Sequence, residues 1–172
     1  MPRLLSRLAR LLRPGLPAPA VGRQAKRTRR ARPRDFQRTR VYRWEADHVF
    51  PRVEAEPLSL AACRGLVEAA YLWAEAPAPG APWRGPPEVT DGRGRRHACG
   101  SRDVIKLPRW ARTRAVVLHE CAHGLAPDLH GPGFVAAYVA LLARFAGLDE
   151  GDLRARLAGA GVRVAERSGL PR

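Results

Sequence analysis

VVLHECAHGL, residues 116–125, is the stretch of this sequence that decides the fold. If it is helical, His119 and His123 lie four residues apart on one face, where both imidazoles can reach one ion. Glu120 lies one position round from His119, close enough to take a proton from a water on that ion without becoming a ligand. Because zinc lowers the pKa of its bound water to about 7, the pattern predicts a hydrolytic site with Glu120 as its catalytic residue.

A third histidine completes the expected ligand set. A catalytic zinc site takes three protein ligands and keeps a fourth position for water or substrate. His130 comes seven residues after His123, beyond Gly124 and Pro127, which turn the chain back. His130 also stands at the entrance of the next apolar segment, so its imidazole can be aimed at the ion. The sequence therefore predicts a Zn2+ site formed by His119, His123 and His130.

Two acidic residues are alternatives for the third ligand. Asp128 is near His123 in the sequence, but the direction of its side chain is less well defined than that of His130. Glu150 would serve only if the following helix ran antiparallel past the site. An isolated HExxH also occurs by chance in helices, but here it lies in an apolar segment and is followed by a third histidine, which favours the metal site.

Further residues are candidates for contact with the substrate or the transition state. Tyr138, on the helix after His130, could turn its hydroxyl toward an oxyanion, and a core tyrosine is the alternative. His97 could face the cleft, and a surface histidine among arginines is the alternative. A strand over 103–107 or 95–99 could pair with an extended substrate, and ordinary sheet is the alternative there.

Periodicity and turn residues indicate the elements of an α+β domain. Residues 41–50 fit either a first strand or the start of a helix, whereas Ser59 can cap a clear helix that follows. Asp91-Gly92 is expected to join the first two strands as a hairpin, which makes the small sheet mostly antiparallel. The expected strands are 88–90, 95–99 and 103–107. Three of the expected helices are 59–75, 133–145 and 149–157. A further helix is expected to begin at Thr113 and to end at Gly124 and Pro127.

Two side chains near the motif are expected to belong to the core. Cys121 is two positions from His119, so on a helix it points away from the ligand face as a small apolar residue. Trp110 is expected to pack beneath the start of the same helix. The three cysteines form no CxxC pair, which favours a reducing compartment and a cytoplasmic location. No apolar run approaches the roughly 18 residues of a membrane span.

Basic residues are concentrated near the N-terminus. Residues 1–40 hold 13 of the 31 Lys and Arg and one acid, Asp35, so the remaining chain is far less basic than the net charge of +15 suggests. Residues 1–34 are expected to be a disordered basic tail, with a weak amphipathic or transit-like helix over 1–13 as the alternative. The composition also fits codon bias, since arginine outnumbers lysine by 29 to 2.

The basic tail raises a second hypothesis, a nucleic-acid-associated protein. In that case the tail would hold phosphates, and the metal domain, residues 35–172, would act on DNA-bound proteins or serve as a structural or binding module. Salt-dependent DNA binding that is lost on deleting residues 1–34 would support it.

Four stretches resemble a known group of proteins. RDFQRTRVYRWE from Arg34, DVIKLPRWAR from Asp103, VVLHECAHGL, and HGPGF from His130 resemble small bacterial HExxH-motif metallopeptidases or metallohydrolases, mainly from actinobacteria and phages, which are similar in pattern to SprT-like zinc peptidases. The resemblance spans most of residues 34–145. It implies a compact zincin-like fold, zinc on the three histidines, catalysis by Glu120 and a protein or peptide substrate. The spacing of the third histidine differs from the HExxHxxGxxH pattern of metzincins.

Overall fold

The computed structural model describes residues 34–53, 55–75, 82–166 and 170–171. The predictions of a disordered basic tail, of a helix over 1–13 and of nucleic-acid binding by the tail fall outside these residues. Among the helices described, none has the length and apolar character needed to cross a membrane.

A mixed three-stranded sheet lies on one side of the domain. Its strands are β1 (Glu88–Thr90), β2 (Cys99–Gly100) and β3 (Val104–Lys106), in the order β1-β3-β2. β1 runs parallel to β3, with Val89 opposite Ile105, and β2 runs antiparallel to it, with Gly100 opposite Ile105. Val89 and Ile105 are buried, so one face of this small sheet contributes to the core.

Two expectations about the sheet were wrong. β1 and β2 are not a hairpin, because both pair with β3, and the sheet is mixed rather than mostly antiparallel. A turn does form after β1, where the Asp91 side chain accepts a hydrogen bond from the Arg93 backbone. The chain then packs Gly92 against Pro108 instead of folding back along β1. Residues 95–98 are irregular, and the second strand begins only at Cys99.

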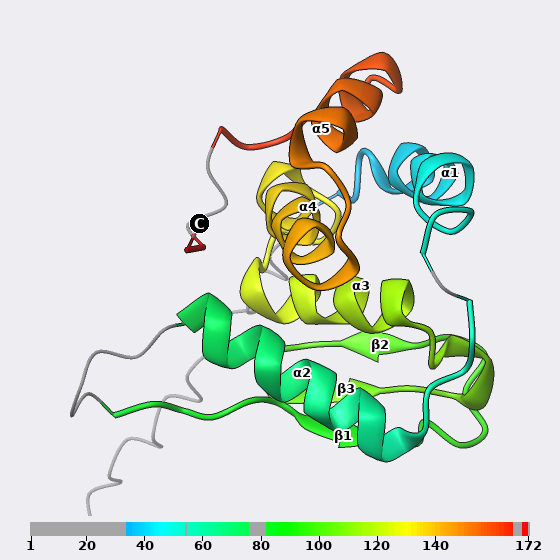
Figure 1. Ribbon diagram of the computed structural model, residues 1–172, viewed down its shortest axis with the longest axis vertical. Coiled ribbons are helices and arrows are strands. Elements are labelled where there is room, and N and C mark those ends of the chain that lie inside the picture. The colour runs from blue at the N-terminus through cyan, green and yellow to red at the C-terminus, as the bar shows by residue number, and fades with distance from the viewer. Residues whose placement is uncertain (1–33, 54, 76–81, 167–169, 172) are drawn as a thin grey trace, which may run out of the picture. The chain divides into compact units, whose positions relative to one another are not determined.

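Helices α2 (Leu60–Glu75) and α3 (Arg114–Leu125) pack beside the sheet and against each other (Figure 1). The Ser59 hydroxyl accepts a hydrogen bond from the Ala62 backbone at 3.0 Å, which confirms its role as the cap of α2. α3 touches β2, one of the two edge strands, and α4 (Pro132–Ala146) lies on the other side of α3. The motif helix is therefore enclosed between the sheet and α4.

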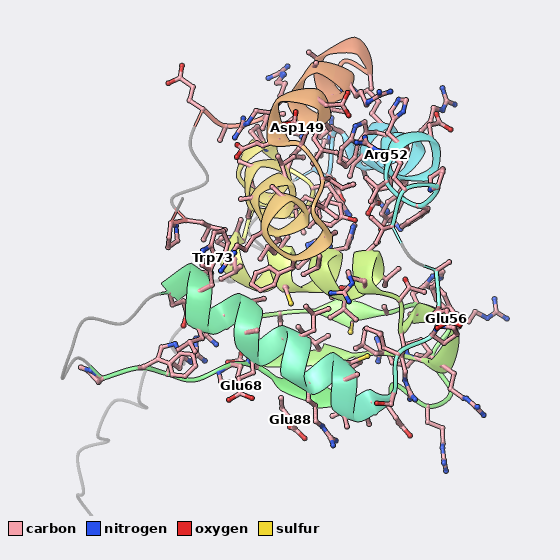
Figure 2. The ribbon with its side chains drawn as sticks, in the orientation of Figure 1. Arg52, Glu56, Glu68, Trp73, Glu88 and Asp149 are labelled. Carbon is pink, nitrogen blue, oxygen red and sulfur yellow. The ribbon has the colours of Figure 1, made fainter. Side chains whose placement is uncertain are left out.

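The stretch that fitted either a strand or a helix is helix α1 (Arg38–His48). Val41 and Trp44 are buried and lie three residues apart, which is helical spacing rather than strand alternation. α1 packs against α5 (Glu150–Gly159), and Arg52, just after α1, donates to Asp152 of α5 at 2.7 Å. Figure 2 shows Arg52 beside α1 and Asp149, which caps α5, at the same end of the domain.

One expectation about α3 is confirmed and one is corrected. The helix ends at Leu125, between Gly124 and Pro127, as the sequence predicted. A side chain at Gly124 would meet the Tyr71 hydroxyl and the Ser101 carbonyl, so glycine permits close packing there. Trp110 does not pack beneath the helix. It lies in a 3-10 turn, η1 (Arg109–Ala111), with 59% of its surface exposed. Cys121 is fully buried, as expected.

Candidate metal centre

Helix α3 positions the first two histidines and the glutamate. It is buried along most of its length between β2 and α4, and only 6% of the surface of either His119 or Glu120 is exposed. His123 is half-buried one turn further on, and its ring centre lies 4.9 Å from that of His119. The i, i+4 spacing therefore brings both imidazoles to one place, as the sequence predicted.

The connection between α3 and α4 brings His130 to the same place. Leu129 has a φ of 62°, in the left-handed region, where the chain reverses direction. His130 follows at 4% exposure, and its ring centre lies 5.3 Å from that of His119 and 4.8 Å from that of His123. One ring nitrogen from each of the three histidines lies within 4.8 Å of the others. These residues form a group that can hold a metal ion.

The two acidic alternatives for the third ligand have other functions. The two carboxylate oxygens of Asp128 accept hydrogen bonds from the backbones of Gly133 and Phe134, each at 2.8 Å, so Asp128 stabilises the first turn of α4. Glu150 begins α5 and accepts a hydrogen bond from Arg154 at 2.8 Å. Neither residue belongs to the three-histidine group among the described residues.

Two carboxylates that sequence reasoning missed hold the histidines in place. Glu45 of α1 lies 2.7 Å from Nδ1 of His119, and Asp35, just before α1, lies 2.7 Å from Nδ1 of His130. A histidine that donates Nδ1–H to a carboxylate presents Nε2 to a metal, so both pairs fix the tautomer that metal binding needs. His123 is hydrogen-bonded instead to the backbone of Leu129.

One signal for these carboxylates was present in the sequence. Asp35 and Glu45 are the two acidic residues of the otherwise basic stretch RDFQRTRVYRWE. This isolation was a signal, but it did not indicate which distant histidines the two carboxylates would meet. In the structure Glu45 is only 2% exposed, and a buried charge of this kind requires a partner.

The surroundings act differently on the three imidazoles. Burial alone would lower the pKa of His119, but the charge and hydrogen bond of Glu45 more than offset it, and the pKa is raised. Burial, together with the positive charges of the neighbouring histidines, lowers the pKa of His123 to about 3. Burial also lowers the pKa of His130, although Asp35 opposes the shift. His123 and His130 are therefore neutral near pH 7, as ligands must be.

Glu120 lies beside the histidines with one carboxylate oxygen free. Burial raises the pKa of Glu120, the charge of His119 opposes this, and the carboxylate also receives a hydrogen bond from the backbone of Gly100. Gly100 of β2 approaches α3 so closely that a Cβ there would meet the backbone of Glu120. Edge strand β2 therefore lies directly against the residue that carries the carboxylate.

Three buried polar atoms at this site have no hydrogen-bond partner among the described residues. They are Oε2 of Glu120, Nε2 of His130 and Oδ1 of Asp35. An unpaired buried polar atom costs about 1–3 kcal/mol, so such atoms are rare unless a ligand or water completes them. His130 already uses Nδ1 for Asp35, and its other nitrogen is therefore directed at the position that an ion would take. The residues present fit a metal ion.

Phe134 and Tyr42 each pack on more than one of the three histidines. Phe134 is fully buried, and its ring centre lies 4.5–4.9 Å from those of all three histidines. Tyr42 of α1 is 42% exposed, and its ring centre lies 4.9 Å from that of His130 and 5.9 Å from that of His119. Phe134 closes the interior side of the group, whereas Tyr42 lies on the side that reaches solvent.

The structure does not support the two candidate contact residues chosen from the sequence. Tyr138 is fully buried, and its hydroxyl donates to the Ala115 carbonyl at 3.3 Å, so it is a core tyrosine beside His119. His97 is exposed in the loop before β2, and its ring contacts none of the three histidines in the described structure.

No family model, curated protein or solved structure matches this chain. The resemblance to HExxH-motif metallopeptidases therefore stays a prediction, and so do the activity and the substrate that it implies. The geometry itself establishes an α+β domain in which three histidines, two of them hydrogen-bonded to carboxylates, form a buried group suited to a metal ion.

Proposed function

We propose that the protein is a zinc-dependent hydrolase of the zincin type, and within that class a metallopeptidase. The observation that supports this is the convergence of His119, His123 and His130 with the free carboxylate oxygen of Glu120 beside them. A donor set of three imidazoles with a fourth position open is typical of catalytic zinc rather than structural zinc.

A zinc ion bound here would polarise the substrate carbonyl and make water acidic near neutral pH. Glu120 would take the proton of the attacking water as the oxygen bonds to the carbonyl carbon. It would then give that proton to the leaving amine as the C–N bond breaks, so the carboxylate ends the cycle as it began. Its raised pKa suits this exchange, because a carboxylate with a very low pKa would be a weak base.

A peptide substrate has one suitable edge of the sheet. β3 is the central strand and has partners on both sides, so the role expected for residues 103–107 is withdrawn. β2 is an edge strand in contact with α3, and its Gly100 touches Glu120. An extended chain that pairs with β2 would pass beside the catalytic carboxylate.

Glu120→Gln tests the proposal, because it keeps the shape of the side chain and removes its basicity. Hydrolysis of an unfolded protein such as casein, measured with zinc present, is expected to fall by at least about 100-fold. Bound zinc is expected to stay near one equivalent, because Glu120 is not a ligand. Glu68→Gln, a carboxylate that Figure 2 shows on α2, is the matched control and should keep wild-type activity. An active Glu120→Gln enzyme would refute the proposed role.

A further inference from the structure

One face of the α1 segment lines the metal centre. Arg38, Tyr42 and Glu45 follow one another in α1 at steps of four and three residues, the spacing of side chains on one side of a helix, and Asp35 lies just before the helix. Asp35 and Glu45 each hydrogen-bond to a histidine of the centre. The two residues between them therefore face the same site, nearer to solvent.

The ring of Tyr42 is held against the ligands rather than free in solvent. It packs edge-on against His130, with an interplanar angle of 77° and 4.9 Å between ring centres. It also lies 5.9 Å from the ring of His119.

The Tyr42 hydroxyl is a free hydrogen-bond donor. No residue in the described structure accepts a hydrogen bond from it, in contrast to Tyr138, whose hydroxyl is used by the Ala115 carbonyl. The guanidinium of Arg38 lies 5.3 Å from the centre of the Tyr42 ring. Because a guanidinium only donates, Arg38 can hold the phenol oxygen while leaving the phenol proton for another acceptor.

We propose that Tyr42 is a catalytic residue whose hydroxyl donates a hydrogen bond to the substrate carbonyl oxygen as that oxygen gains negative charge. Arg38 acts as a positioning residue, which orients the phenol and adds a positive charge beside it. The inference rests on the proposed hydrolase function. It assigns to α1 the oxyanion contact that sequence reasoning had sought in Tyr138.

A donor in this position acts on the transition state more than on the bound substrate. Removing one such donor typically lowers kcat by about 10²–10³ and changes KM little. Tyr42→Phe keeps the ring that packs on His130 and removes only the hydroxyl. The substitution is therefore expected to lower kcat while the protein keeps its metal and its fold.

Binding of acetohydroxamate to the cobalt-substituted protein tests the contact without a peptide substrate. Cobalt can take the place of zinc, and its visible absorption spectrum reports on the ligands of the ion. Acetohydroxamate binds to such an ion through an anionic oxygen. Tyr42→Phe is expected to weaken acetohydroxamate binding about tenfold, the value of one lost hydrogen bond, with the cobalt spectrum before titration unchanged.

Variants of two of the three arginines of α1, Arg38 and Arg43, separate the role of Arg38 from general charge. Arg38→Gln should weaken acetohydroxamate binding, and Arg38→Lys should restore part of the affinity because it keeps a positive charge. Arg43→Gln is the matched control, since Arg43 is an exposed residue of α1 that makes no described contact with the histidines. It should bind acetohydroxamate as the wild-type protein does.

The outcomes distinguish this inference from the proposed function. Equal acetohydroxamate affinity in wild type and Tyr42→Phe would overturn the role of Tyr42, while inactivity of Glu120→Gln would still support a hydrolase. An altered cobalt spectrum in Tyr42→Phe before titration would also overturn it, because the tyrosine would then act on the ligands. A wild-type protein that binds no cobalt or zinc would overturn the metal centre and the inference together.

Discussion

At the scale of single residues, the site depends on which nitrogen each histidine presents. Glu45 and Asp35 take the Nδ1 atoms of His119 and His130, which leaves Nε2 for an ion. The sequence predicted the three histidines and Glu120 because helical spacing and a chain reversal are local properties. It did not predict the two carboxylates, which lie 74 and 95 residues away from their partners.

Glu45→Gln tests this support of the ligands. Glutamine can still accept the hydrogen bond of His119, but it removes the negative charge that strengthens the imidazole as a ligand. We expect zinc affinity to fall about 10–100-fold in competition with a chromogenic chelator. Asp47→Asn removes an exposed carboxylate of the same helix and should leave zinc affinity unchanged. Equal zinc affinity in Glu45→Gln and wild type would exclude a role for Glu45.

The stability of the metal-free protein should depend on pH through His123. Its pKa falls from 6.5 to about 3 on folding, so between these values the unfolded chain binds more protons than the folded chain. The contribution of His123 to the free energy of unfolding is therefore fully present above about pH 6.5 and is lost as the pH falls toward 3. The raised pKa of His119 acts in the opposite direction.

Urea unfolding of the chelator-treated protein between pH 7.5 and pH 4 measures this effect. His123→Gln should show a smaller loss of unfolding free energy over that range than the wild-type protein. His97→Gln, which changes an exposed histidine, should follow the wild type. The assignment fails if His123→Gln and wild type lose stability in parallel.

At the scale of elements, close backbone contacts place α3 against its neighbours. Gly100 of β2 and Gly124 of α3 both lie where a side chain would collide with the opposing element.

The helices were predicted well because their apolar periodicity and the cap at Ser59 are local signals. The strand pairing was not, because the choice between β1 and β3 as the partner of β2 depends on contacts distant in sequence, here Gly92 against Pro108.

Gly124→Ala should destabilise the protein even though alanine favours helices. The added methyl group would meet the Tyr71 hydroxyl and the Ser101 carbonyl, and overpacking of this kind costs about 1–3 kcal/mol. Gly65→Ala in α2 is the control, because nothing lies within 4 Å of its Cβ position. Gly65→Ala should stabilise the protein by about 1 kcal/mol. Chemical denaturation of both variants measures the difference, and a neutral Gly124→Ala would contradict the close contact.

At the scale of the whole domain, the metal group joins distant parts of the chain. The α1 segment reaches the histidines of α3 and of the loop before α4, and it is held against the C-terminal region by Gln37. The side chain of Gln37 donates to the Arg163 carbonyl and accepts from the Arg163 backbone, both at 3.0 Å. Metal binding should therefore stabilise the folded state as a unit.

Zinc should raise the thermal midpoint of the metal-free protein. A ligand at 100 times its Kd stabilises the folded state by about 2.7 kcal/mol, which corresponds to several degrees for a domain of this size. Magnesium at the same concentration is the control, because Mg2+ prefers oxygen ligands and should leave the midpoint unchanged. A thermal midpoint that zinc leaves unchanged would contradict coupling between the metal group and the fold.

The zinc content of the purified protein tests the central claim most directly. Elemental analysis after dialysis against zinc and then against metal-free buffer should give about one equivalent per chain for the wild type. His130→Ala removes one of the three converging ligands and should retain little or no zinc under the same treatment. A wild-type protein without zinc, or a His130→Ala variant that holds as much as the wild type, would contradict the three-histidine metal centre.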